Sequence, residues 1–306
     1  MNQDLVVPEK STNVRVLVSP AGWPVKAIRT GFRVLSPTLP SLAARWAEDL
    51  FFSPRRPFRP AWELEVLGRG ERMSIARGDK PPLAAWRWGA EGPHTKTVLL
   101  VHGWQGRGAQ LGTFVEPLVD AGFSVVAFDA PAHGDTGGKR ASPMHIAAAI
   151  ERVLAEIGDV HAIVAHSMGA LATSIVMAKA QRASKLVYVA PSIGPARYEE
   201  TFARVLGLGD DVRGRMRKII EERYSVKMTD LEATRLAARI QAPLLVVHDR
   251  DDDDVPVEDG KALVAAWGEA ELMETRGLGH RRVLKDEDVI ARVVRFVRRV
   301  EALGRA

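Results

Sequence analysis

From about residue 71 onward, short apolar runs alternate with longer segments in which apolar residues recur at helical spacing. The run at 97–101 (TVLLV) has no polar alternation, which predicts a strand buried on both faces of a parallel sheet. By the same criteria we predict a β-hairpin from 71–77 and 83–88, strands at 123–128, 160–165, 185–189, 243–247 and 271–275, and helices at 111–118, 143–157, 168–179, 257–267 and 287–303. This alternation predicts an α/β fold, a mostly parallel twisted sheet with helices on both faces.

Two segments interrupt this alternation. Between 191 and 241, charged helical segments at 213–223 and 230–239 stand where one crossover helix would join two strands, so we interpret 191–241 as an inserted helical cap. Near the N-terminus, the spacing of Leu42, Trp46 and Leu50 predicts a short amphipathic helix, and the Pro- and Arg-rich stretch 53–60 follows it. The predicted organisation is an N-terminal extension (1–70) packed on the main domain, a core (71–190 and 242–306) and the cap.

Composition narrows the chemistry. The chain has 306 residues, 46% of them apolar, which supports a large core and excludes disorder as the dominant state. The net charge is 43 − 38 = +5 with both signs scattered, which argues against nucleic acid as a partner. The absence of cysteine excludes thiolate metal sites and a cysteine nucleophile.

The sequence also bears on location. It begins without a basic, apolar leader, so we expect no signal peptide, and no run reaches the roughly 18 apolar residues of a membrane span. We therefore expect a cytoplasmic protein without stable membrane insertion, and the sequence indicates no oligomeric state.

The segment 163–171 (IVAHSMGAL) joins a predicted strand to a predicted helix with no loop residues. Such a turn is sharp and strained, and it crowds the residues two before and two after its centre, here the small Ala165 and Gly169. Ser167, at the centre, should project above the sheet beside the first amides of the following helix. We expect the amide of Met168 to stabilise negative charge that builds on a carbonyl oxygen attacked by this serine.

This segment resembles the nucleophile elbow of the α/β-hydrolase family, with Ala165 where the commoner form has glycine. The resemblance covers about 96–300 and implies an acid and then a histidine after the serine. The family's Gly-x-x-Asp-x-x-Val-Pro pattern selects Asp252 from the acidic run 249–254, with Asp251 as the alternative, and His280 follows that run. A calcium loop is a poorer interpretation of this run, because its sixth and twelfth positions are Asp254 and Gly260 rather than Gly and Glu.

The resemblance also implies a second oxyanion donor. His102-Gly103-Trp104 is similar to the family's His-Gly-x motif, which assigns this role to the amide of Trp104. The loops that carry His102, Gly103 and His166 end at the same edge of the sheet, and we expect these residues to shape the substrate pocket.

The function implied is that of a serine hydrolase, and a small-molecule carboxylic ester is the expected substrate. A thioesterase, an amidase or a lactonase with the same residues stays an alternative, as does a non-catalytic ligand-binding protein of this fold. Neither a metal nor an organic cofactor is required by this chemistry. The serine at the elbow argues against a dehalogenase or an epoxide hydrolase, which have aspartate there.

Overall fold

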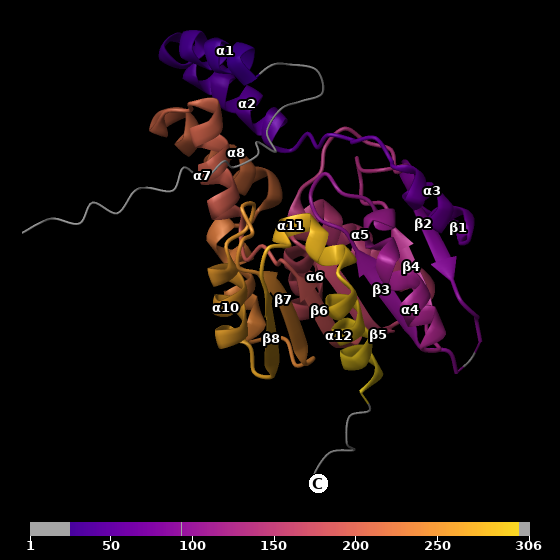
Figure 1. Cartoon of the computed structure of the whole chain (residues 1–306). Coiled ribbons are helices and arrows are strands. Elements are labelled where there is room, and N and C mark those ends of the chain that lie inside the picture. The colour runs from indigo at the N-terminus through magenta and orange to yellow at the C-terminus, as the bar shows by residue number, and fades with distance from the viewer. Residues whose placement is uncertain (1–24, 93, 300–306) are drawn as a thin grey trace, which may run out of the picture.

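The computed structural model describes residues 25–92 and 94–299, and within them eight strands form one sheet in the order β1-β2-β4-β3-β5-β6-β7-β8 (Figure 1). The strands are β1 (Glu71–Arg77), β2 (Lys80–Trp88), β3 (Thr97–Val101), β4 (Ser124–Phe128), β5 (Val160–His166), β6 (Ala183–Val189), β7 (Leu244–Asp249) and β8 (Ala270–Thr275). The β1–β2 hairpin joins the sheet antiparallel to β4, and the strands from β4 to β8 are parallel. The predicted mostly parallel sheet is confirmed.

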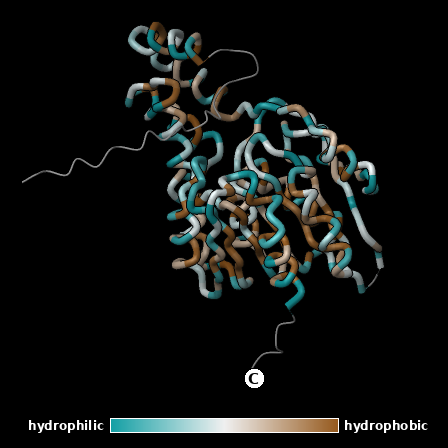
Figure 2. The backbone as a smooth tube through the Cα atoms, viewed as in Figure 1, coloured by the Kyte–Doolittle hydropathy of each residue, from teal (hydrophilic) through white to brown (hydrophobic). Residues whose placement is uncertain are grey.

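Helices cover both faces of the sheet, which is brown with apolar residues in Figure 2. One face packs against α5 (Pro143–Ile157), α6 (Met168–Lys179), α9 (Ala233–Ala237) and α10 (Val257–Ala266). The other packs against α3 (Ala61–Gly68), the 3-10 helix η1 (Gly108–Phe114), α4 (Val115–Asp120) and α12 (Glu287–Arg298). Because both faces are covered, the strands β3 to β7 are almost entirely buried, as the apolar runs predict.

Several predicted elements differ in their bounds. The helix expected at 111–118 is η1 followed by α4, because α4 begins at Val115 and so places Pro117 in a first turn, where its missing N–H is not needed. After β8 the chain forms the short helices α11 (Gly279–Arg282) and η3 (Val283–Lys285), which were not predicted from the sequence. The last helix ends at Arg298, and the remainder of its predicted span lies outside the described residues, apart from Arg299.

The N-terminal helices α1 (Val25–Thr38) and α2 (Pro40–Phe51) lie against α7 (Pro195–Leu206) and α8 (Asp210–Tyr224) (Figure 1). Their apolar residues share a cluster with those two helices and with the short η2 (Met228–Leu231), separate from the two clusters on the sheet. The helices α1 and α2 thus pack mainly on the cap, and α2 also reaches the main domain through the ion pairs of Glu48 and Asp49 with Arg140. On α2, Trp46 and Leu50 pack against this cluster, whereas Leu42 is 52% exposed and Ala43 and Ala47 are buried.

Downstream of α2, the chain returns to the sheet, and α3 packs on η1. The boundaries near residues 70, 190 and 241 stay a prediction. Within the described part of the chain, every helix is too short or too polar to cross a bilayer.

Candidate active site

Ser167 lies on the turn between β5 and α6, with no residue between the strand and the helix other than itself. Its backbone has φ 53° and ψ −121°, a region that side chains rarely adopt and that costs about 1–3 kcal/mol. A Cβ at Gly169 would lie 2.5 Å from the carbonyl oxygen of His102, so only glycine fits this close approach. The predicted sharp turn is present, and the Met168 amide follows Ser167 at the first turn of α6.

Asp252 and His280 are joined by a hydrogen bond, in which His280 Nδ1 donates to Asp252 Oδ2 at 2.8 Å. The other carboxylate oxygen accepts from the backbone amides of Asp254 and Val255, each at 2.9 Å. Burial by itself would raise the pKa of Asp252, but the nearby His248 and the hydrogen bond from His280 outweigh burial and hold this pKa well below its usual range. The carboxylate is therefore ionised and oriented toward the His280 ring.

The neighbouring acids have other partners. The Asp251 side chain is 58% exposed and accepts from the Gly277 amide at 3.0 Å. Asp249 accepts from the Thr275 hydroxyl at 2.7 Å and from the Leu278 amide at 3.1 Å, and so ties the end of β7 to the end of β8. The structure thus brings Asp252, rather than the alternative Asp251, to His280.

Two further histidines support this pair. His166 Nε2 donates to the backbone carbonyl of His280 at 2.9 Å, and the two rings lie 4.6 Å apart. Burial, together with the charge of His280, lowers the pKa of His166 to about 3, so it is neutral. His248 is fully buried with its Nε2 3.6 Å from Asp252 Oδ2, and it donates to the Val255 carbonyl. His248 had no predicted role, although its position near the end of β7, beside the acidic run, could have indicated one.

The loop after β3 is held against Ser167. A Cβ at Gly103 would lie 2.9 Å from Ser167 Cβ, so this loop approaches the serine as closely as a glycine allows. His102 Nδ1 donates to the Gly103 carbonyl at 2.7 Å, and its Nε2 accepts from the Ala130 amide at 2.9 Å. Burial lowers the pKa of His102 well below its usual value, which agrees with this neutral form. These contacts fix the backbone that leads to the Trp104 amide.

The Ser167 hydroxyl forms no hydrogen bond within residues 25–92 and 94–299, and His280 Nε2 likewise has no hydrogen-bond partner there. In unliganded active sites such bonds are often long and shorten only in the reacting complex. The structure therefore places Ser167 and the Asp252–His280 pair at one edge of the sheet, at the carboxyl ends of β5, β7 and β8.

A narrow cavity of about 10 Å³ borders the turn of Ser167, which is space for about one water molecule. Its walls come from α6, the loop after β3, the end of α2 and the starts of α5 and α7. The side chains that line it include Met168, Leu171, Trp104, Phe51, Phe52 and Tyr198. The expected pocket residues His102, Gly103 and His166 do not line it. Instead, Gly103 approaches Ser167, His166 Nε2 donates to the His280 carbonyl, and both ring nitrogens of His102 are engaged by nearby backbone groups.

Comparison with known proteins agrees with this geometry. Residues 98–293 match the family model described as "Alpha/beta hydrolase family". The chain belongs to the α/β-hydrolase family. A search of curated proteins finds no match.

Solved structures with the same fold include members of this family with several activities. The chain is similar to a monoacylglycerol lipase from Paleococcus ferrophilus (24% identity, TM-score 0.56, covering 70% of this chain and 98% of that one). It is also similar to an esterase from Pyrococcus furiosus (22% identity, TM-score 0.61, 80% and 98%). A bromoperoxidase from Bacillus anthracis is similar as well (15% identity, TM-score 0.57, 74% and 99%). At these identities the likeness shows the fold.

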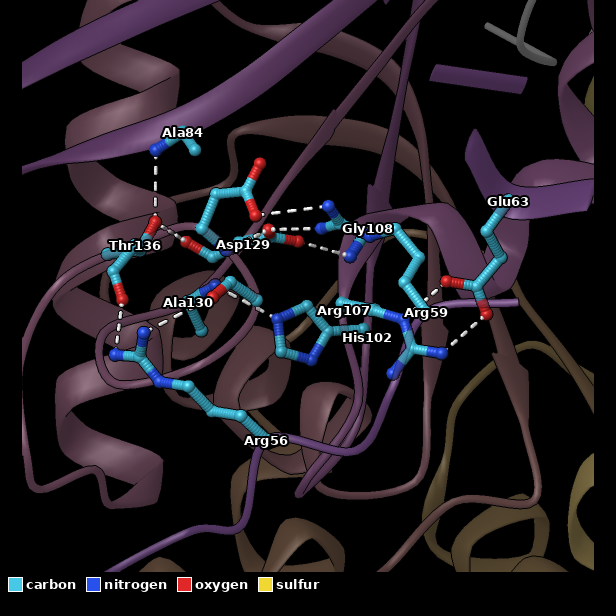
Figure 3. A network of polar contacts seen from close by, with 12 residues as sticks. Arg56, Arg59, Glu63, Ala84, His102, Arg107, Gly108, Asp129, Ala130 and Thr136 are labelled. Atoms are coloured by element: carbon cyan, nitrogen blue, oxygen red, sulfur yellow. Dashed lines mark hydrogen bonds and ion pairs between the residues drawn. The ribbon is translucent and has the colours of Figure 1, made fainter. Parts of the chain in front are cut away.

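In this α/β hydrolase, the segment between α2 and α3 contacts the loop that follows β4 (Figure 3). The Arg56 guanidinium donates to four backbone carbonyls of that loop, at 2.8 Å to Thr136 and at 3.1–3.3 Å to the other three, of Ala132, Gly134 and Gly138. Arg107, which follows the loop that carries Trp104, forms a buried ion pair with Glu63 of α3. These contacts were not predicted from the sequence.

Asp129 links the loop after β4 to the segment that follows Trp104. Its carboxylate accepts from the amides of Gly108 and Asp135, each at 2.7 Å, and pairs with Arg59 at 3.2 Å. Burial raises the pKa of Asp129 to about 6, although these hydrogen bonds and the Arg59 charge oppose the increase. In the loop after β4, His133 Nε2 accepts from the Gln105 backbone amide at 3.0 Å. The Gln105 backbone has φ 53°. The segment 53–63 is therefore part of one hydrogen-bonded unit with the loop that carries Trp104.

Proposed function

We propose that this α/β hydrolase cleaves small carboxylic esters, with Ser167 as the nucleophile, His280 as the base and Asp252 as the residue that orients it. The observation that carries the proposal is the combination of the strained Ser167 turn with the 2.8 Å Asp252–His280 hydrogen bond at the same edge of the sheet. The esterase and lipase activities of proteins with the same fold support it.

In the proposed reaction, His280 Nε2 takes the Ser167 hydroxyl proton as Oγ attacks the ester carbonyl. The Met168 and Trp104 amides hold the resulting oxyanion. His280 then protonates the departing alkoxide, which leaves an acyl group on Ser167. A water molecule, deprotonated by His280, attacks this acyl group and releases the carboxylic acid together with free Ser167. No step needs a metal or an organic cofactor.

The cavity supports a preference for small, apolar acyl groups. Aromatic and aliphatic side chains form most of its wall, and its interior holds about one water molecule before any side chain moves. Longer acyl chains would have to displace Phe51, Phe52 or Tyr198, which come from the α2 end and from α7. We therefore propose acetyl and propionyl esters as the preferred class.

The direct test is hydrolysis of p-nitrophenyl acetate combined with labelling by a fluorophosphonate. Ser167→Ala should lose activity by at least about a thousandfold and should no longer be labelled. Ser192→Ala is the matched control, since Ser192 lines the same cavity and its amide donates to the Ser167 carbonyl. Labelling of a different serine, or an active and folded Ser167→Ala protein, would refute the mechanism.

Acetyl thioester, acetanilide and lactone substrates in the same assay separate the alternatives. We expect the ester to react faster than the anilide, because an alkoxide leaves more readily than an amine. Faster turnover of the thioester or of the lactone would instead indicate a thioesterase or a lactonase. A folded protein that is not labelled and hydrolyses none of them would indicate a ligand-binding member of the family.

A further inference from the structure

A second cavity, of about 350 Å³, lies between the β1–β2 hairpin, the loop after β4 and helix α5. Every charged residue that lines it is basic: Arg77, Lys80, Arg140 and Arg152, with His145 beside them. We call it the basic cavity. It is separate from the narrow cavity at Ser167, and neither the reaction proposed above nor the family match gives it a role.

Two of the four cations have partners that leave little free charge. Arg140 pairs with Glu48 and Asp49 of α2, and Arg152 pairs with Glu156 one helical turn away at 3.0 Å. None of these three carboxylates lines the cavity. Their charges offset Arg140 and Arg152 from outside and leave the cavity surface without an acidic group.

The other two cations are unpaired. Arg77 Nε donates to the Pro81 carbonyl at 2.8 Å, which holds the guanidinium in place. In the described part of the chain, its two Nη atoms and the Lys80 ammonium have neither a hydrogen-bond nor an ion-pair partner. Burial lowers the pKa of Arg77, and burial together with the charges of Lys80 and Arg140 lowers the pKa of His145. These cations therefore act on one shared space, and about two positive charges in it are uncompensated.

Phosphate esters match this arrangement better than carboxylates. A phosphate monoester carries about −1.5 to −2 charges at neutral pH, close to the unpaired charge of Arg77 and Lys80, whereas a carboxylate carries one. The fixed Arg77 fork can engage two phosphate oxygens while Lys80 acts as a point charge. The volume is at the lower end for small-molecule sites, and Pro81, Pro131 and Ala148 supply an apolar wall for an attached group.

We propose that the basic cavity binds the phosphoryl group of an organic phosphate monoester through Arg77 and Lys80. The ester could be a free small molecule or the headgroup of an anionic lipid such as phosphatidic acid, because both present the same group. The site is distinct from Ser167, so its occupation does not depend on the proposed ester hydrolysis.

Isothermal titration with phenyl phosphate tests the free form, with benzoate and phenol as the monoanionic and neutral analogues. We expect saturable binding of phenyl phosphate, binding of benzoate that is about tenfold weaker, and no binding of phenol. Raising NaCl from about 0.05 to about 0.25 M should weaken the binding, because the cavity is open to screening at Lys80. Lys80→Gln should weaken it about tenfold.

Lys96→Gln is the matched control, since Lys96 is an exposed lysine at the opposite end of the sheet, just before β3. It should bind as the wild type does, and both variants should hydrolyse p-nitrophenyl acetate at the wild-type rate. Co-sedimentation with phosphatidylcholine vesicles, with and without phosphatidic acid, tests the lipid form.

If Lys80→Gln reduces binding to the phosphatidic acid vesicles while phenyl phosphate binds weakly, the source is a lipid headgroup. If Lys80→Gln reduces the binding of phenyl phosphate while the phosphatidic acid vesicles bind weakly, the source is a free ester. The proposal is overturned if neither probe binds, if benzoate binds as tightly as phenyl phosphate, or if Lys80→Gln and Lys96→Gln behave alike.

Discussion

The Asp252–His280 pair gives the sharpest test of the proposed mechanism, through the substitution Asp252→Asn. The asparagine keeps the size of the side chain. Its carbonyl oxygen can still accept from the Asp254 and Val255 amides, which lie 2.9 Å from Asp252 Oδ1 in the wild type. Its amide group then takes the place of the oxygen that lies 2.8 Å from His280 Nδ1. Because that group is a donor, Nδ1 must become the acceptor and the ring proton must move to Nε2.

A His280 with its proton on Nε2 cannot take the proton of Ser167. In a serine triad, removing the carboxylate in this way lowers kcat about ten thousandfold, which corresponds to about 5 kcal/mol in the activation barrier. The loss should appear in kcat more than in KM, because the carboxylate acts on the transition state rather than on substrate binding. The fold should persist, since both backbone contacts of residue 252 are kept.

Asp251→Asn is the matched control. It neutralises a carboxylate one residue away, but that side chain is mostly exposed and contacts the Gly277 amide rather than His280. We expect its kcat with p-nitrophenyl acetate to stay within about threefold of wild type. Circular dichroism shows whether both variants fold. A folded Asp252→Asn protein with more than a tenth of the wild-type kcat, or an equal loss in both variants, would refute the assignment of Asp252.

Three further predictions concern the surroundings of the site. In urea titrations, Arg56→Ala should lower the free energy of unfolding by about 1–2 kcal/mol, because it removes hydrogen bonds to four backbone carbonyls. Arg69→Ala loses only one exposed ion pair and should have no measurable effect on this free energy. The pKa of Asp129 is about 6 in the folded protein and lies above its unfolded value, so its stabilising contribution is complete below about pH 4 and is lost as the pH rises through 6. Between about pH 4 and pH 7, the free energy of unfolding of the wild type should therefore fall by about 3 kcal/mol relative to that of Asp129→Asn. A difference between the two proteins that does not change with pH would contradict this prediction. Tyr198→Ala should enlarge the narrow cavity and raise the ratio of kcat/KM for p-nitrophenyl octanoate to kcat/KM for p-nitrophenyl acetate about tenfold. Tyr224→Ala changes a tyrosine of the same cap that does not line the cavity, and it should leave this ratio unchanged.

The sheet and its flanking helices could be predicted because each has a strong local period. The apolar run 97–101 coincides with β3, and the helices predicted at 143–157 and 168–179 coincide with α5 and α6. The first and third N-terminal helices, α1 and α3, were not predicted. In α1 a helical pattern is present, but the buried contacts of Ile28 and Phe32 are made with α2 and the cap, and such contacts are not readable from a local pattern.

The candidate site was predictable for a related reason. In a parallel sheet the carboxyl ends of the strands lie along one edge, so polar residues at the ends of β5, β7 and β8 converge whatever separates them in the chain. Ser167, Asp252 and His280 each follow such a strand. The choice between Asp252 and Asp251 was less accessible, because a shift of one residue in a loop changes which carboxylate faces His280, and only the turn closed by the amides of Asp254 and Val255 decides it.

The contacts of Arg56 lay beyond sequence reasoning for a different physical reason. Its partners are backbone carbonyls, which every residue has, so no residue type in the loop after β4 marks them. Yet these contacts, with the Arg59–Asp129 ion pair, connect the N-terminal segment to the loops that hold Gln105 and Trp104. Since a misplaced oxyanion donor lowers the rate even when nucleophile and base are intact, we expect the Pro- and Arg-rich stretch 53–60 to support the proposed donor at Trp104 as well as to join two helices.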